Sequence, residues 1–361
     1  MTGKMKHSHS VDFLNQDHIE LDFIVDELLN DRNLDADLRN EIVKNIKTVV
    51  GNQEIQWISR NGTEHLVEYI VHRFKFKNYP RLKKLEPFPL HLLIEPTSVC
   101  NLRCKMCFQS DRSFQTREYL GMMDFELFKN LVDQTVENNC KSLTLASRGE
   151  PTLHKEFGDM LQYCKNKFLE LKINTNATKL SEELSYEILD AGVDIVVFSI
   201  DSYYKEEYEK IRVGGDFGIV LKNIERFHEI KLSKDKYRKT STRVSGVYLD
   251  EDQSKEKFLN FWKEIVDTVT FSDVVARWDT YNNDLMSFSK PCEFLWERMY
   301  VWQDGICNPC DYDYKSKLCV GDAKKTPLKE IWTGETYNKY RNMFLEGKRQ
   351  FILPCNKCNV Y

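Results

Sequence analysis

Residues 95–109, EPTSVCNLRCKMCFQ, decide how the rest of the chain is organised. Their three cysteines follow the pattern C-x3-C-x2-C and come directly after an apolar run, LLI at residues 92–94, which predicts a buried strand that ends in a loop. Such a loop can place three thiolates around one compact inorganic cluster. Because a four-iron cluster held by three thiolates keeps one iron without a protein ligand, the pattern predicts an open, reactive metal position. The spacing alone also leaves a zinc site or three incidental cysteines open.

The composition describes an ordinary soluble globular protein with room for one large domain and one or two small ones, since 30% of its 361 residues are charged and 41% are hydrophobic. The net charge of −4 favours no particular partner. No apolar run approaches the ~20 residues of a membrane span, and the first ten residues lack the apolar core of a signal peptide, so we expect a cytoplasmic protein. Seven of the eleven cysteines form two spaced groups, which in a reducing compartment indicates metal rather than disulfides.

At Cys100, Cys104 and Cys107 the sequence resembles the radical S-adenosylmethionine (radical SAM) enzymes, whose signature is this triple-cysteine spacing. The resemblance implies a [4Fe-4S] cluster whose free iron is chelated by S-adenosylmethionine, and an electron that splits this molecule into methionine and a 5′-deoxyadenosyl radical. The radical then abstracts hydrogen from the substrate, and an external flavodoxin or ferredoxin type of protein donates the electron. The position before the third cysteine is usually aromatic in this family. Here it is Met106, with the aromatic displaced to Phe108, and we expect the adaptable Met106 to pack over the cluster as well.

A strand-then-helix rhythm repeats from Pro89 to about Asp284. Together with the resemblance it predicts an α/β fold, a partial (βα)6 TIM-like barrel, with an N-terminal helical extension at residues 1–88, the barrel at 89–288 and a small cysteine-rich domain at 289–361. The expected strands are 91–95, 141–146, 169–174, 194–200, 242–249 and 268–271, and the expected helices between them are 125–138, 155–165, 182–191, 216–229 and 255–265.

The N-terminal extension predicts two or three amphipathic helices, followed by residues 71–84, in which basic side chains alternate with aromatic ones. Such a stretch could bind RNA, a phosphate-bearing substrate or a membrane surface. We favour a solvated strand or linker that leads into the barrel, because the chain as a whole is acidic. No nucleic-acid partner is therefore expected.

Polar motifs follow the expected strands, where parallel barrels gather their reactive groups. Residues 147–151, SRGEP, resemble the family's Gly-Gly-Glu-Pro motif. The Glu150 carboxylate suits the α-ammonium of S-adenosylmethionine, Gly149 lets the backbone approach the ligand, and Arg148 in place of the first glycine puts the local backbone geometry in question. Four other expected cofactor-binding residues are short polar groups, which are also typical of loop caps: Asn174, Asn176, Ser199 and Asp201. The fifth, Arg212, resembles the family's arginine that binds the carboxylate of S-adenosylmethionine.

A second cysteine group lies toward the end of the sequence, with separations of 18, 45 and 3 positions along Cys292, Cys310, Cys355 and Cys358. Four soft ligands suffice for a closed site. The tail resembles the SPASM and twitch extensions of radical SAM enzymes, in which such cysteines bind an auxiliary four-iron cluster, and four ligands favour the one-cluster, twitch-like form. Cys307 could compete with Cys310, Cys319 is a further spare, and a tetrahedral zinc site is the alternative.

The tail implies oxidation of a substrate radical, in which the auxiliary cluster accepts an electron and a base takes a proton. Asp311 and Asp313, which follow Cys310, are the candidate bases. We expect an oxidoreductase-like enzyme that oxidises or rearranges a small molecule, a sugar or nucleotide-linked metabolite. Peptide-maturing relatives often carry a recognition module rich in strands, whereas the N-terminal extension of this chain is predicted to be helical. A peptide-modifying maturase and a non-catalytic iron-sulfur or zinc scaffold are the alternatives.

Overall fold

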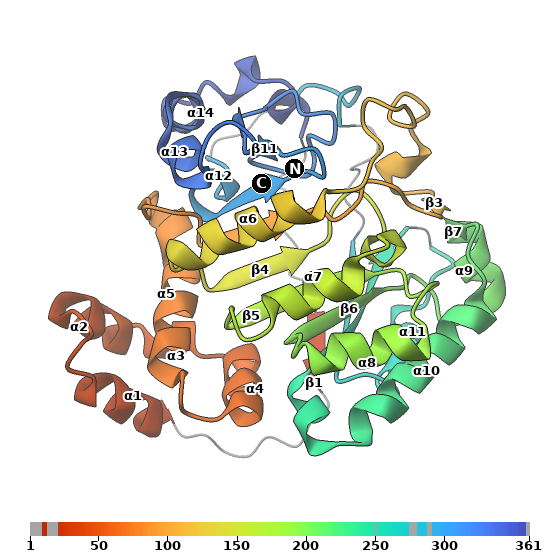
Figure 1. The fold of residues 1–361 in the computed structure, drawn as a ribbon, viewed down its shortest axis with the longest axis horizontal. Helices are drawn as coiled ribbons and strands as arrows, with labels where there is room; N and C mark the ends of the chain where they lie inside the picture. The colour runs from red at the N-terminus through yellow and green to blue at the C-terminus, as the bar shows by residue number, and fades with distance from the viewer. Residues whose placement is uncertain (1–8, 13–20, 250, 274–279, 287–290, 359–361) are drawn as a thin grey trace.

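A computed structural model describes residues 9–12, 21–249, 251–273, 280–286 and 291–358, so the expected boundary between residues 288 and 289 lies outside the described residues. One sheet of ten strands runs through this part of the chain in the order β1-β9-β8-β6-β5-β4-β2-β10-β11-β12 (Figure 1). Its strands are β1 (His9–Asp12), β2 (His91–Ile94), β4 (Ser142–Leu145), β5 (Glu170–Thr175), β6 (Ile195–Ser199), β8 (Ser241–Tyr248), β9 (Thr268–Asp273), β10 (Arg298–Val301), β11 (Ile306–Asn308) and β12 (Gly321–Asp322).

The six expected strands pair in parallel, from β2 through β4, β5, β6 and β8 to β9, which confirms the prediction of a partial α/β barrel. Each crossover contains at least one helix, as parallel neighbours require. Serine and aspartate N-caps start several of these helices: the side chain of Ser181 accepts from Leu184 N, and that of Asp124 accepts from Leu127 N. The helices are α6 (Phe125–Glu137), α7 (Phe157–Cys164), α8 (Glu182–Asp190), α9 (Lys205–Ile211), α10 (Phe217–Leu232) and α11 (Lys255–Trp262).

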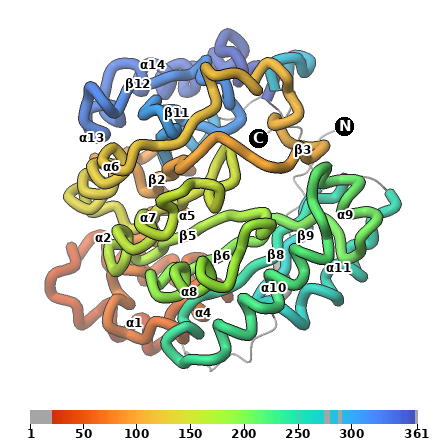
Figure 2. The backbone as a smooth tube through the Cα atoms, turned by 45° about the vertical axis from the view of Figure 1, so that its right-hand side comes forward, coloured from red at the N-terminus to blue at the C-terminus, as the bar shows by residue number. Residues whose placement is uncertain are grey.

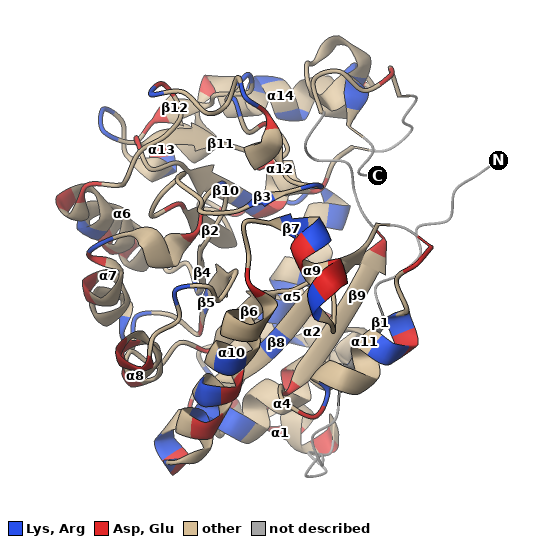
Figure 3. Cartoon of the chain, turned by 90° about the vertical axis from the view of Figure 1, so that its right-hand side faces the viewer, with Lys and Arg blue, Asp and Glu red and all other residues tan. Residues whose placement is uncertain are grey.

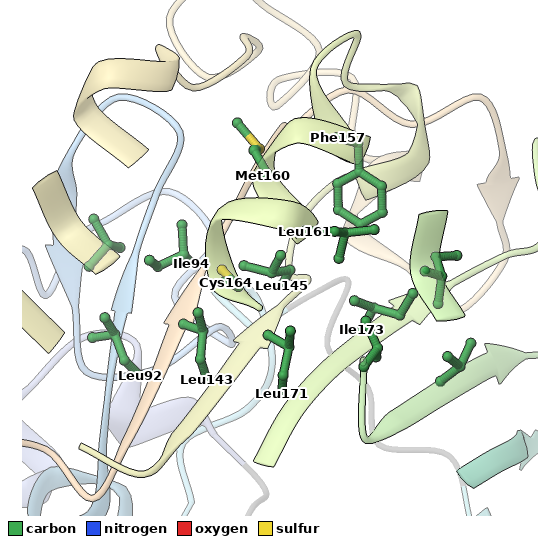
Figure 4. Close-up of a cluster of buried hydrophobic side chains, with 14 of the residues drawn as sticks. Leu92, Ile94, Leu143, Leu145, Phe157, Met160, Leu161, Cys164, Leu171 and Ile173 are labelled. Atoms are coloured by element: carbon green, nitrogen blue, oxygen red, sulfur yellow. The ribbon is translucent and has the colours of Figure 1, made fainter. Parts of the chain in front are cut away.

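Alternate residues on the strands face the helices and form the main apolar core. Figure 4 shows Leu143, Leu145, Leu171 and Ile173 directed toward α7, where Phe157 and its neighbours meet them. Complete burial of one such side chain contributes roughly 1.5–3 kcal/mol. Because successive side chains on a strand point to opposite faces, the residues between them face the interior of the barrel.

The N-terminal extension is a helical layer with its own apolar core, built on α1 (Leu21–Asn30), α2 (Ala36–Lys44), α3 (Ile46–Val49), α4 (Asn52–Asn61) and α5 (Leu66–Leu82). Helices were expected there. The prediction that residues 71–84 form a solvated strand or linker is wrong, because most of them belong to α5.

The basic residues of α5 have partners within the protein. Arg73 is buried and donates to Glu54 (Nε to Oε1, 2.8 Å), and the Lys75 ammonium lies 2.7 Å from Oε2 of Glu86. Glu54 lies in α4 and Glu86 lies in the loop after α5, so the sequence pattern of α5 alone could not show that its positive charges are paired. Lys and Arg are also interspersed with Asp and Glu along α10 (Figure 3).

The C-terminal segment extends the same sheet. Strand β10 pairs in parallel with β2, and β11 and β12 follow in antiparallel pairing. Figure 2 shows these elements beside β2 and α6, with helices α13 (Leu328–Thr333) and α14 (Glu335–Leu345) around them. Leu295 and Trp332 lie in the same apolar cluster as the barrel helices, so the segment shares the barrel's core. Of the described helices, none has the length and apolar character needed to cross a membrane.

Candidate active site

The three cysteines of the first group line one cavity of about 400 Å³ at the carboxyl ends of the parallel strands. Their loop leaves β2 and contains the short strand β3 (Arg103–Cys104), which pairs with β7 (Arg212–Val213). This pairing sets Cys104 opposite Arg212, although 108 positions separate the two residues in the sequence. The backbone therefore brings the expected carboxylate-binding arginine to the cysteine loop.

Each thiol has a hydrogen-bond donor close by. The backbone N–H groups of Leu102 and Gln109 point to Sγ of Cys100 and Cys107, both at 3.5 Å, and the Arg212 guanidinium lies 3.8 Å from Sγ of Cys104. Burial raises the pKa of Cys100 to about 11. Burial also raises the pKa of Cys104. Thiols with donors placed for the thiolate form are suited to a positively charged iron centre that deprotonates them on binding.

The two residues around the third cysteine have different surroundings. Met106 lines the cavity beside the thiols, in keeping with the expectation that it packs over a cluster. The Phe108 ring is buried and stacks on Tyr314 with ring centroids 4.8 Å apart. The aromatic residue of this loop therefore also joins the cysteine loop to the C-terminal segment.

The loop after β4 needs glycine at position 149. A Cβ added there would lie 2.2 Å from the carbonyl oxygen of Thr97 and 2.6 Å from that of Val99, closer than backbone atoms tolerate. The unusual backbone conformation falls on Ser147, with φ of 144°, and not on Arg148. Arg148 fits in place of the family's glycine because its side chain turns toward the buried Glu95.

Glu150 is a buried acceptor at the centre of this loop. Its carboxylate accepts from Thr152 N and Oγ1, from Thr175 Oγ1 at 2.7 Å and from Asn176 N at 2.6 Å. Burial raises the pKa of Glu150, while these hydrogen bonds oppose the rise. The carboxylate is thus held in one orientation at the wall of the cavity that contains the thiols.

The remaining expected cofactor-binding residues line the same cavity. The Asn176 amide is 3.1 Å from Oδ1 of Asn101 and 4.0 Å from Sγ of Cys100, and Asp201 forms a buried ion pair with Arg212 at 2.8 Å. In the described part of the chain, Oδ1 of Asn174 has no hydrogen-bond partner, although it is buried. Such an atom in a cavity wall suits a polar ligand. Ser199, which was expected, also lines the cavity. So do two residues that the motif search missed and that the rule of strand ends would have found, Ser272 and Asp273.

The four cysteines of the second group lie near one another. Burial is the main cause that raises the pKa of the thiols of Cys292, Cys310 and Cys355, and the charge of at least one other cysteine of the group adds to the rise for each of them. Cys307 is buried in the apolar core, and its neighbouring cysteine is Cys319. The donor set of four soft thiols suits an iron-sulfur cluster.

The two candidate bases differ in their surroundings. Asp311 lines the cavity that contains the three thiols, and its Oδ1 lies 3.3 Å from the hydroxyl of Tyr300, another lining residue. Asp313 is completely buried outside that lining and accepts from Tyr281 Oη at 2.6 Å, as well as from Asn308 and two backbone N–H groups. Burial raises the pKa of Asp313 to about 6, against the effect of these bonds. Its position favours a role in holding the loop, so Asp311 is the better candidate.

Comparison with known proteins places these features in a family. Residues 94–272 match the radical SAM superfamily, and residues 292–359 match the SPASM family, an iron-sulfur cluster-binding domain. A tungsten-containing aldehyde ferredoxin oxidoreductase cofactor-modifying protein of Pyrococcus furiosus is 39% identical over 112 residues, which are 31% of this chain and 30% of that protein. The antilisterial bacteriocin subtilosin biosynthesis protein AlbA of Bacillus subtilis is 31% identical over 35% of this chain and 27% of its own length. The matches thus span about a third or less of these relatives.

Among solved structures, Streptococcus suis SuiB bound to the precursor peptide SuiA superposes with a TM-score of 0.56 and 18% identity, covering 78% of this chain and 72% of SuiB. This likeness concerns the fold alone. The two matched domains imply a [4Fe-4S] cluster that binds S-adenosylmethionine and auxiliary iron-sulfur clusters, in place of the zinc and incidental-cysteine alternatives. The chain belongs to the radical SAM superfamily and carries a SPASM iron-sulfur cluster-binding domain.

Proposed function

We propose that this protein is a radical SAM enzyme that oxidises a small polar substrate, such as a sugar or a nucleotide-linked metabolite. The observation that carries the proposal is the position of Asp311, one residue after Cys310 and in the lining of the cavity that contains Cys100, Cys104 and Cys107. A carboxylate between the two cysteine groups can take a proton from a substrate that loses a hydrogen atom near the first group and an electron near the second.

When bound, the clusters and S-adenosylmethionine supply hydrogen-atom abstraction and an electron acceptor. The chain's own residues position the substrate and move a proton. A carbon that bears a hydroxyl loses a hydrogen atom, its oxygen loses a proton, one electron departs, and a carbonyl results. Asp311 takes the hydroxyl proton, and Tyr300, 3.3 Å from its Oδ1, fixes the orientation of the carboxylate.

We also propose which cysteines hold each cluster and how the chain is divided into domains. The ligands are Cys100, Cys104 and Cys107 for the first cluster, and Cys292, Cys310, Cys355 and Cys358 for the auxiliary one. Residues 1–88, 89–288 and 289–361 form the helical extension, the radical SAM core and the auxiliary-cluster segment. A flavodoxin or ferredoxin type of protein donates the electron, and the enzyme works in the cytoplasm.

Peptide modification is the second candidate function. It is favoured by the likeness in fold to SuiB, whose structure holds a precursor peptide, and by the sequence match to a bacteriocin biosynthesis protein. Deuterium transfer distinguishes the two candidates. Anaerobically reconstituted protein is incubated with S-adenosylmethionine, a reductant and labelled pools of sugars, nucleotide sugars or peptides. If the substrate is a small molecule, deuterium should pass from a sugar or nucleotide-sugar pool into 5′-deoxyadenosine. Transfer from the peptide pool alone would refute the small-molecule substrate.

We predict that Asp311→Asn lowers substrate oxidation by about 100-fold or more, because the amide cannot take the hydroxyl proton. Formation of 5′-deoxyadenosine should fall much less than product formation, since hydrogen abstraction precedes the proton transfer. Product and 5′-deoxyadenosine are quantified together by mass spectrometry. Asp313→Asn is the matched control for a carboxylate outside the cavity lining. If the ratio of product to 5′-deoxyadenosine falls more in that variant than in Asp311→Asn, the base is Asp313.

We also predict that Glu150→Gln weakens binding of S-adenosylmethionine by about 10- to 100-fold, the loss of one charge-assisted interaction with the ammonium group. Equilibrium dialysis with the reconstituted protein measures the dissociation constant. Glu156→Gln is the control, because Glu156 lies in the same stretch and its carboxylate is 4.0 Å from the ammonium of Lys155. Equal affinity in both variants would remove Glu150 from the cofactor site.

A further inference from the structure

Three strands carry a basic residue one layer below the cavity. On each strand, the residue two positions later lines the cavity, and residues two apart share a face of a strand. The basic residues therefore point into the barrel interior, deeper than the cavity wall. All three side chains keep part of their surface exposed, although their strands lie within the sheet. The pairs are Lys172 and Asn174 on β5, Arg243 and Ser245 on β8, and Arg298 and Tyr300 on β10.

The charges converge on one another. The pKa of Lys172 is lowered to about 8, first by burial and then by the guanidinium groups of Arg243 and Arg298, against the opposing effect of Glu170. The pKa of His91, which opposes Arg298 in the β10–β2 register, is lowered by burial, Arg298 and Lys172. Lys172 and His91, on different strands, thus experience the same positive potential. We call the region of the barrel around Lys172, Arg243 and Arg298 its floor.

The carboxylates beside this floor are engaged by groups other than Lys172 and Arg243. Glu170 is 3.5 Å from Nη1 of Arg73 and 3.6 Å from Nε2 of His72, and Glu297 pairs with Arg298. Lys172 itself makes no hydrogen bond or ion pair with any described residue. Burial of an unpaired charge is costly, so a protein keeps one where a ligand neutralises it.

We propose that Lys172 and Arg243 bind an anionic group of the substrate, a carboxylate or a phosphate, at the floor of the barrel. The inference deepens the proposed function and rests on it only for the identity of the bound molecule as substrate. An anion at this depth leaves the rest of the molecule extended toward the cysteine loop, past Tyr300 and Asp311. The floor then selects charged sugars, phosphorylated metabolites or acidic termini over neutral compounds.

Lysine labelling tests the site without the radical reaction. The full-length, anaerobically reconstituted protein is treated with formaldehyde and a mild borane reductant, and methylation of each lysine is followed by mass spectrometry. Inorganic phosphate or acetate should lower the labelling of Lys172 at least about fivefold as the site fills, by mass action. The exposed Lys179, in the loop after the same strand, is the internal control and should be unaffected.

Each result of this experiment bears on the proposal. Protection by phosphate alone assigns a phosphate group, protection by acetate alone assigns a carboxylate, and both results support the site. Equal labelling with phosphate, acetate and neutral glycerol overturns it, as does a Lys172 that never reacts, because the floor would then be closed to small molecules. A protected Lys172 in a protein that forms no 5′-deoxyadenosine would refute the proposed function and leave the anion site intact.

Two variants separate binding from a structural role. Lys172→Met should fold with an unchanged or higher Tm, because it removes an unpaired interior charge, and should lose the phosphate-dependent rise in Tm of about 2 °C or more expected for the parent protein. Arg243→Gln should weaken the protection of Lys172 by phosphate or acetate. A lower Tm of Lys172→Met, with the anion-dependent rise preserved, would show that the ammonium serves the fold and would overturn the proposal.

Discussion

Replacement of Cys104 by alanine is expected to abolish the formation of 5′-deoxyadenosine from S-adenosylmethionine. The cluster of a radical SAM enzyme depends on three protein thiolates, and the remaining two cannot hold a four-iron cube with one open position. Cys104 is also the most buried of the three thiols and lies beside Arg212. Its loss therefore removes both a ligand and the contact that places the arginine.

The measurement uses anaerobically reconstituted protein with a reductant, with iron content and the visible charge-transfer band recorded beside the nucleoside yield. Cys319→Ala is the matched control, since Cys319 is exposed and outside both groups. It should retain the first cluster and the cleavage activity. A Cys104→Ala protein that still cleaves S-adenosylmethionine would contradict the assignment of the cysteine loop as the cluster site.

The barrel could be predicted because its signals are local. Each expected strand alternates or is continuously apolar, and N-capping side chains such as Ser181 and Asp124 mark where helices begin. The polar motifs after the strands meet at one cavity because parallel strands end at the same edge of the sheet. Short-range patterns were therefore enough to bring Glu150 and the cysteine loop together.

Other features depend on contacts that no local pattern contains. Residues 298–301 read as part of the cysteine-rich tail, yet they pair with β2 about 200 positions earlier. Asp311 and Asp313 are equivalent in the sequence, and only the fold turns one to the cavity and the other to Tyr281. Likewise, the alternating pattern of its strand predicts a solvated Lys172, and only the fold shows that the charges of Arg243 and Arg298 act on it.

Arg148 shows how a departure from a family motif can be accommodated. It donates to both oxygens of Glu95, from Nε at 2.8 Å and from Nη2 at 2.6 Å, and also to the carbonyl oxygen of Tyr314 at 3.0 Å. Its guanidinium carbon lies 4.3 Å from the ring centroid of Trp302. A single side chain thus joins the ends of β2 and β4 to the C-terminal segment, with both charged groups removed from water.

Arg148→Met is therefore expected to lower the free energy of unfolding by about 3–5 kcal/mol, because it leaves the completely buried Glu95 carboxylate without its counter-charge. Adding Glu95→Leu should recover part of this loss, since the double variant removes the buried charge altogether. Urea titrations followed by tryptophan fluorescence compare the variants. Arg238→Met, which breaks an exposed pair with Asp235 at 3.6 Å, should cost less than about 1 kcal/mol. If Arg148→Met costs no more than Arg238→Met, the contact between Arg148 and Glu95 does not hold the C-terminal segment against the barrel, and another contact must do so.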